Sequence, residues 1–149
     1  MPEIRLTTSV AAPPEQVFDL SLDVELHTRS TGAREEIVGG VTEGLMGPGD
    51  EVTWRAWHFR IPWTMTSRIT DYERPLRFVD EQQRGPFASW WHQHEFHATA
   101  AGTEMIDHVR YTSPAGPIGS LVDRLILKSH LTALLTTRND HIKAEAEAG

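Results

Sequence analysis

Polar and apolar residues alternate for about eighty residues, from Arg34 to the proline at position 114, and this pattern restricts the possible folds more than any other feature. Turn-forming residues interrupt the alternation at positions 44–50, 60–62, 73–75, 84–86 and 100–102. Strands joined by loops this short lie side by side and run antiparallel. The segment therefore predicts a meander of about six strands, the first of them Arg34–Gly40.

One more strand and two short helices are predicted before the meander. Residues Glu3–Val10 alternate in polarity and end at a pair of prolines, which suits a half-buried strand. Pro14 can occupy the first turn of a helix, because its missing N–H would have no intrahelical partner there. A second helix is expected over Asp23–Arg29, with Asp23 as its N-cap.

The end of the chain has a helical pattern. After position 117, apolar residues recur every three or four positions, at Ile118, Leu121, Val122, Leu125, Leu131, Leu134 and Leu135. This spacing predicts a long C-terminal helix whose apolar face packs across the sheet. The polar residues of the helix expected to face water are Asp123, Arg124, Arg138 and Asp140. The tail Ala144–Gly149 is expected to fray.

These elements predict a single α+β domain over residues 1–149. A curved antiparallel sheet of seven strands would wrap around the long C-terminal helix, with the two short helices following the first strand. A chain of 149 residues is long enough to bury a sizeable core. Because a strongly curved sheet cannot pack fully against one helix, we expect a cavity between them.

Two segments of the meander carry a family resemblance: FVDEQQRGPFASWWHQHEF, residues 78–96, and TEMIDHVRYTSPAG, residues 103–116. Together with the order of elements, they resemble the helix-grip fold of the START-like (SRPBCC) superfamily, in particular its bacterial polyketide cyclase/dehydrase-like, ligand-binding branch. The superfamily also includes birch-pollen-allergen-like proteins and lipid-transfer domains. The resemblance implies the fold more strongly than one activity, because transport, sensing and catalysis share this scaffold.

Composition excludes several classes of function. The chain has no cysteine, so it can form neither a disulfide nor a thiolate metal site. Acidic residues outnumber basic ones by 21 to 14, and no block of Lys or Arg is present to neutralise a phosphate backbone, so no nucleic-acid partner is expected. No segment reads as a signal peptide or an integral membrane span, which predicts a cytoplasmic protein.

The alternation also predicts which side chains face the cavity, because residues two apart in a strand share a face. Four acid–base candidates, Asp80, His92, His94 and Asp107, lie on faces that are otherwise aromatic or aliphatic. Leaving such a group buried without a partner costs about 1–3 kcal/mol, so we expect a hydrogen-bonded His–Asp network. The network would orient a ligand oxygen or move a proton; alternatively it has a purely structural role.

Ligand-binding candidates come from the same faces and from the helix. They are Trp54, His58, Trp63, Met65, Phe78, Gln82, Trp90, Phe96, Tyr111 and Leu125. Indole rings offer large flat apolar surfaces with one N–H donor, and they suit a hydrophobic or aromatic ligand. The alternative is that several of these side chains simply fill the core.

The sequence does not predict a metal site. The pair His92 and His94 places two imidazoles on one face, which suits zinc if a third ligand such as His58 or Asp107 comes near. Spacing alone does not locate that third ligand, and therefore neither a metal nor another cofactor is expected.

The leading hypothesis is a binding module that holds a lipid, a polyketide or an aromatic metabolite between the sheet and the C-terminal helix. The alternative is a cyclase/dehydrase-type enzyme in which His92 or His94 is the acid–base group and Asp80 or Asp107 orients it. In that enzyme Tyr111 or Gln82 would hold a substrate oxygen. A third hypothesis is an interaction protein or homodimer formed through Trp57 or Trp91, which have the outward parity.

Overall fold

The computed structural model describes residues 2–30, 35–58, 61–113, 121 and 126–149. Seven strands of this part form one antiparallel sheet in the order β1-β7-β6-β5-β4-β3-β2. Their bounds are β1 Glu3–Val10, β2 Glu35–Gly40, β3 Glu51–His58, β4 Ile61–Glu73, β5 Arg77–Arg84, β6 Ser89–Thr99 and β7 Gly102–Thr112. The helices bounded within these described residues are α1 Pro14–Ser21, α2 Val24–Ser30 and α4 Lys128–Ala148. The predicted helix-grip architecture is confirmed.

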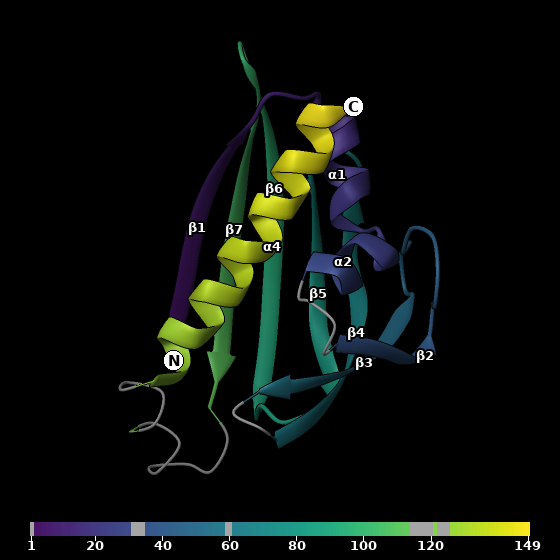
Figure 1. Ribbon diagram of the computed structural model, residues 1–149, viewed down its shortest axis with the longest axis vertical. Coiled ribbons are helices and arrows are strands. Elements are labelled where there is room, and N and C mark those ends of the chain that lie inside the picture. Colours follow the sequence, from purple (N-terminus) through teal and green to yellow (C-terminus); the bar gives the residue numbers. More distant parts are fainter. Residues whose placement is uncertain (1, 31–34, 59–60, 114–120, 122–125) are drawn as a thin grey trace.

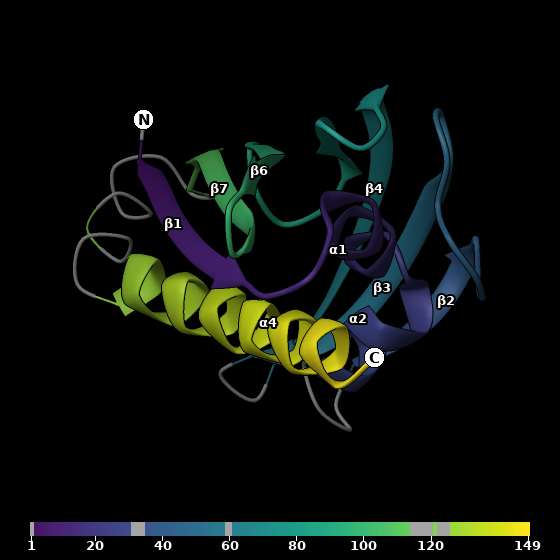
Figure 2. The same ribbon diagram turned by 90° about the horizontal axis from the view of Figure 1, so that it is seen from above.

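The sheet curves around α4, which crosses its concave side (Figures 1 and 2). Helices α1 and α2 lie beside the C-terminal half of α4, and Gln16 of α1 donates a side-chain hydrogen bond to the Ala146 carbonyl. Helix α1 begins at Pro14 as predicted, and the chain reverses direction between β1 and α1 (Figure 1). The three helices therefore cover one face of a single sheet.

Two apolar clusters hold the helices against the sheet. In the first, the fully buried ring of Phe18 from α1 meets the rings of Tyr72, Phe78 and Phe96 edge-on, with centroid distances of 5.3–5.5 Å. In the second, Leu135 of α4 packs with buried side chains of β1 and β7. The candidate site lies between these clusters.

The first strand and the N-cap of α2 agree with the sequence predictions. The strand Glu3–Val10 is present, and the N–H of Leu26 donates to Asp23 Oδ1 at 3.1 Å, so Asp23 caps α2 as expected. The turn expected at 60–62 was placed too late, because β4 already begins at Ile61. The expected first turns of the C-terminal helix fall mainly on residues 118–120 and 122–125, outside the described residues.

The prediction that the tail frays from Ala144 is wrong. Helix α4 continues to Ala148, and Ala146 is buried against the core. Glu147 accepts a hydrogen bond from the backbone N–H of Ala11 at 2.9 Å and an ion pair from Lys143 at 2.8 Å. Contacts with α1 and with the end of β1 therefore hold the last turns in place.

The outer face of the sheet carries the two tryptophans considered for an interface. Trp57 is 47% exposed, whereas Trp91 is half-buried under the Arg110 guanidinium, which lies 5.0 Å from the ring centroid. A homodimer through this face stays a prediction.

None of the helices in the described part of the chain is both long and apolar enough to cross a membrane.

Candidate ligand-binding site

A cavity of about 260 Å³ lies between the concave face of the sheet, α2 and α4. Its walls are mainly apolar, and Leu131, Leu134 and Leu135 of α4 line the helix side. Five predicted ligand-binding residues line the sheet side: Trp54, Trp63, Met65, Phe78 and Trp90. The alternation of the strands brings these side chains together because each points to the same face of the sheet.

Other predicted ligand residues lie away from the lining. Phe96 and Tyr111 are fully buried behind the wall, where Phe96 packs on Phe18 and Tyr111 packs beside Trp90. The side chains of His58 and Leu125 lie outside the described part of the structure. The ligand-binding roles of these residues stay predictions.

Gln82 is also absent from the lining, and its side chain holds a loop that shapes the cavity. Its amide Nε2 donates to the Phe87 carbonyl at 2.8 Å, and its Oε1 accepts from the Phe87 N–H at 3.2 Å. Phe87 itself lines the cavity. Gln82 therefore positions the link between β5 and β6.

The four predicted acid–base residues meet at one side of the cavity. The strand register pairs Asp80 of β5 with His92 of β6, and His94 of β6 with Asp107 of β7. His92 Nε2 lies 2.7 Å from Asp107 Oδ1, and His94 Nε2 lies 2.6 Å from Asp80 Oδ2. We call these four residues the His–Asp cluster.

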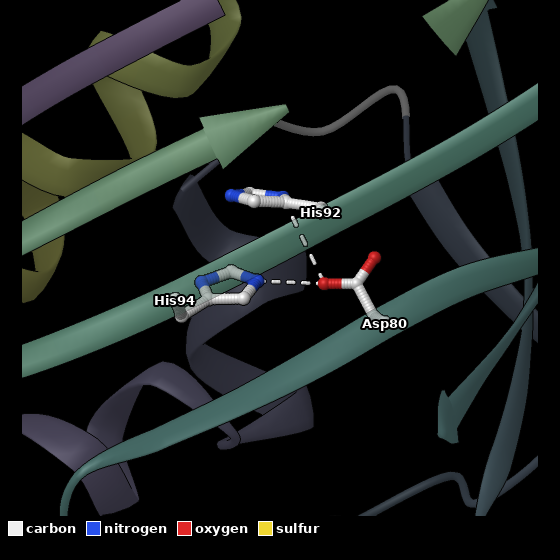
Figure 3. Close-up of side chains that lie close together, drawn as sticks. All are labelled: Asp80, His92 and His94. Carbon is white, nitrogen blue, oxygen red and sulfur yellow. Dashed lines mark hydrogen bonds and ion pairs between the residues drawn. The ribbon is translucent and has the colours of Figure 1, made fainter. Parts of the chain in front are cut away.

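Ring stacking fixes the orientation of both imidazoles. The rings of His92 and His94 stack with centroids 3.7 Å apart, and Phe78 stacks on the other side of His94 at 4.0 Å. Because the faces of His94 are covered, only its edge, with both nitrogens, can meet polar groups. The edges of both rings point to the two carboxylates (Figure 3 shows the contacts with Asp80).

Helix α4 completes the cluster with Asn139 and Arg138, neither of which was predicted as a site residue. Asn139 Nδ2 donates to Asp107 Oδ2 at 2.7 Å. Arg138 Nη1 lies 3.8 Å from Asp107 Oδ1, and its Nη2 donates to the Ser21 carbonyl at 3.2 Å. The expectation that Arg138 faces water is wrong, because only 6% of it is exposed. The spacing in the sequence indicates this burial. Arg138 follows Leu131 by seven residues and Leu135 by three, which places it on the buried stripe of the helix.

Both carboxylates are held in the ionised form. Burial opposes ionisation of Asp80, but the attraction of His92 and the hydrogen bond from His94 outweigh it and lower its pKa from 3.8 to about 2. Burial opposes ionisation of Asp107 in the same way, but the hydrogen bond and charge of His92 outweigh it and lower the pKa of that carboxyl group. Both carboxylates therefore accept hydrogen bonds at neutral pH.

His94 is a neutral imidazole at neutral pH. Burial and repulsion by His92 lower its pKa from 6.5 to about 4, against the opposing attraction of Asp80. Its Nε2–H donates to the ionised Asp80, which leaves Nδ1 with a lone pair. This Nδ1 is buried, has no hydrogen-bond partner and lies 3.4 Å from Asp107 Oδ1. A lone pair therefore faces a carboxylate.

The cluster also contains three groups that can hold a metal ion. One ligand atom each from Asp80, His92 and His94 lies within 4.8 Å of the others (Figure 3). Among the described residues, the third residue is Asp80 and not Asp107, which was considered from the sequence. The side chain of His58, the other candidate considered, lies outside the described part of the structure.

Comparisons with known proteins agree with this fold and site. The chain belongs to the family described as polyketide cyclase/dehydrase and lipid transport, whose model matches residues 1–147. The family and its structural relatives support a ligand-binding fold of the START-like superfamily. No curated protein sequence matches significantly.

Solved structures show the same architecture at low sequence identity. Protein TTHA0849 from Thermus thermophilus matches with a TM-score of 0.75 and 21% identity, over 97% of this chain and 99% of that one. The Zhui aromatase/cyclase from a Streptomyces species matches with a TM-score of 0.76 and 18% identity, over 98% and 93%. Ara h 8.0201 matches with a TM-score of 0.69 and 14% identity, over 99% of both chains.

Proposed function

We propose that the protein binds a compact hydrophobic small molecule, an aromatic metabolite or a polyketide fragment, in the cavity between the sheet and α4. The observation that carries this proposal is an apolar cavity walled by aromatic rings, with one charged cluster at its side. Ordinary ligand pockets span about 300–1,000 Å³, so a cavity of about 260 Å³ suits a compact ring system better than a long acyl chain.

The polar side of the cavity indicates which groups such a ligand carries. Asp80 lines the cavity, its side chain is 21% exposed, and its carboxylate is ionised. An ionised carboxylate only accepts hydrogen bonds, so it would select a ligand with a hydroxyl or N–H donor. The similarity to a protein titled an aromatase/cyclase supports an aromatic, oxygen-bearing ligand.

Filling the cavity is expected to weaken binding. Ala56 lines the cavity on β3, so an Ala56→Trp indole would occupy space that a ligand needs. We expect at least tenfold weaker binding of N-phenyl-1-naphthylamine, a neutral aromatic probe, followed by its fluorescence and by energy transfer from tryptophan. Ala133→Trp is the matched control, because Ala133 is exposed on α4.

Native mass spectrometry of the protein as purified identifies a ligand that travels with it. The proposal is contradicted if no ligand copurifies and the probe shows no saturable binding, or if the Ala56 and Ala133 variants bind the probe as wild type does. Circular dichroism of both variants distinguishes a filled cavity from a misfolded chain.

A second function, proton-transfer catalysis of the cyclase/dehydrase type, is favoured by the orientation of His92. Its Nε2 is engaged by buried Asp107, while its Nδ1 lies on the side of Asp80, 3.7 Å from Asp80 Oδ2. A base oriented by a carboxylate and placed on a cavity wall is the arrangement of a general acid–base catalyst.

If such catalysis occurs, His92→Ala is expected to reduce turnover of a short poly-β-ketone thioester about a hundredfold, the contribution of one acid–base group. Binding of N-phenyl-1-naphthylamine should change little, because removal of the His92 imidazole leaves the apolar walls intact. Equal turnover by wild type and variant, or no turnover by either, would contradict the catalytic proposal and leave the binding proposal unaffected.

A further inference from the structure

We propose that Asp80, His92 and His94 form a binding site for a divalent transition-metal ion of the Zn²⁺ type at the side of the cavity. The ligand atoms are Asp80 Oδ2, His92 Nδ1 and His94 Nε2; the Asp80 oxygen faces both rings (Figure 3), and one ligand atom of each residue lies within 4.8 Å of the others. This site goes beyond the proposed binding of a hydrophobic molecule and does not depend on it.

The geometry of the three atoms is close to what the ion requires. Zinc takes imidazole nitrogen and carboxylate oxygen at about 2.0–2.2 Å, so neighbouring ligand atoms of a tetrahedral site lie about 3.3 Å apart. Asp80 Oδ2 lies 2.6 Å from His94 Nε2 and 3.7 Å from His92 Nδ1. Side-chain shifts on the order of 1 Å bring these two separations to the tetrahedral value. Asp80 lines the cavity, and its side chain is 21% exposed.

The surroundings of both histidines are those of metal ligands. A metal-binding imidazole usually donates its other N–H to a carboxylate, which fixes the tautomer. Asp107 Oδ1 lies 2.7 Å from His92 Nε2 and 3.4 Å from His94 Nδ1, on the far edge of each ring from the proposed ion. Asp107 is itself held by Asn139, which donates to its other oxygen. One buried carboxylate can thus orient both ligands.

A bound ion also provides a hydrogen-bond partner for the unpartnered nitrogen of His94. When His94 Nε2 donates to Asp80, its buried Nδ1 has no proton and no hydrogen-bond partner, and it faces Asp107. When Nε2 binds a metal, the proton moves to Nδ1 and can be donated to Asp107 Oδ1. Each ring nitrogen of the cluster then faces either the ion or a carboxylate.

Charge balance is compatible with an added cation. A metal-binding imidazole is neutral, so in the loaded site the carboxylates of Asp80 and Asp107 carry two negative charges against one positive charge on Arg138. Buried charges are costly unless they are compensated. A divalent ion together with one anionic oxygen in its open position makes the cluster neutral. The three ligand residues all line the cavity, so that open position faces the bound molecule.

The test uses the full-length chain without a histidine tag and Co²⁺ alone as the probe. Titration of the wild-type protein should show one saturable site with visible absorption of a four- or five-coordinate ion. Proton NMR should show two paramagnetically shifted imidazole N–H resonances, one from each histidine. Absence of saturable Co²⁺ binding, or binding without these shifted resonances, overturns the proposal.

Variants assign the site to these residues. Asp80→Asn and His94→Gln should each weaken Co²⁺ binding at least tenfold. His97→Gln is the matched control, because His97 is on the same strand and its side chain is 53% exposed. Binding that falls equally in the His97 variant, or that persists in the other two, indicates a surface site and overturns the proposal. Binding of N-phenyl-1-naphthylamine, measured on the metal-free protein, tests the cavity separately.

Discussion

The free energy of unfolding of an Asp107→Asn variant is expected to be about 3–5 kcal/mol lower than that of the wild-type protein. This is the usual cost of removing one partner from a buried ion pair. Asp107 is fully buried and accepts hydrogen bonds from His92 on one oxygen and from Asn139 on the other. Arg138 lies 3.8 Å away. An asparagine keeps the shape but turns an N–H₂ group toward one of these donors, and it removes the negative charge that lies 3.8 Å from Arg138.

Urea unfolding followed by circular dichroism measures this loss. Asp71→Asn is the matched control, because Asp71 pairs with Arg77 at 2.9 Å on the surface, where both side chains are nearly half exposed. Exposed pairs contribute about 0–1 kcal/mol, so the control should stay within that range. A loss in the Asp107 variant no larger than in the control would mean that water reaches the cluster and that Asp107 does not organise it.

The alternation of residues was sufficient to predict the sheet and the faces of its strands. A shift by one residue moves every side chain to the other face, so a strand that buries one face has a well-defined parity. This is why Trp54, Met65, Phe78 and Trp90 could be placed on the concave side before the structure was known. The order of β2 to β7 followed from the short links between them, whereas the pairing of β1 with β7 is not set by a short turn.

The partners within the His–Asp cluster depend on strand register, which the sequence defines less closely. Asp80 pairs with His92 because the link between β5 and β6, residues 85–88, leaves their positions opposite each other. The register of such a hairpin depends on the exact length and conformation of its link, and an error of one residue changes every partner. Spacing alone therefore could not identify Asp80 as the third metal-ligand candidate.

Parity also cannot separate cavity positions from core positions on one strand. Phe78 and Phe96 share the inward face, but Phe96 lies under the Phe18 ring at 5.3 Å and does not line the cavity. Which part of a strand is covered depends on where α1 sits, and that follows from tertiary packing. For the same reason Tyr111 lies behind Trp90 and Phe87.

The wild-type protein is expected to lose stability as the pH falls from about 6.5 to about 4, and His94 is the main cause. Its pKa is 6.5 in the unfolded chain and about 4 in the folded protein. Between these values the unfolded state binds a proton that the folded state does not, so the free energy of unfolding falls as the pH falls. A difference of this size corresponds to about 3 kcal/mol at 1.36 kcal/mol per pKa unit.

Asp80 extends the effect to lower pH. Its pKa is 3.8 in the unfolded chain and about 2 in the folded protein, so the stability that it contributes is present above pH 3.8 and is lost as the pH falls toward 2. Asp107 acts in the same direction. The titratable and charged groups around His94 are His92 on its own strand, Asp80 on β5, Asp107 on β7 and Arg138 on α4.

Replacing His94 with glutamine separates the contribution of this residue from the rest. Glutamine keeps an N–H donor for Asp80 but has no proton to gain, so the free energy of unfolding should fall less steeply between pH 6.5 and 4 than in the wild type. Urea unfolding at half-unit pH steps, with a chelator present to exclude metal linkage, measures both slopes. His97→Gln, on the same strand but exposed, should keep the wild-type slope. Parallel curves for the wild type and the His94 variant would show that His94 takes up its proton as readily in the folded protein as in the unfolded chain.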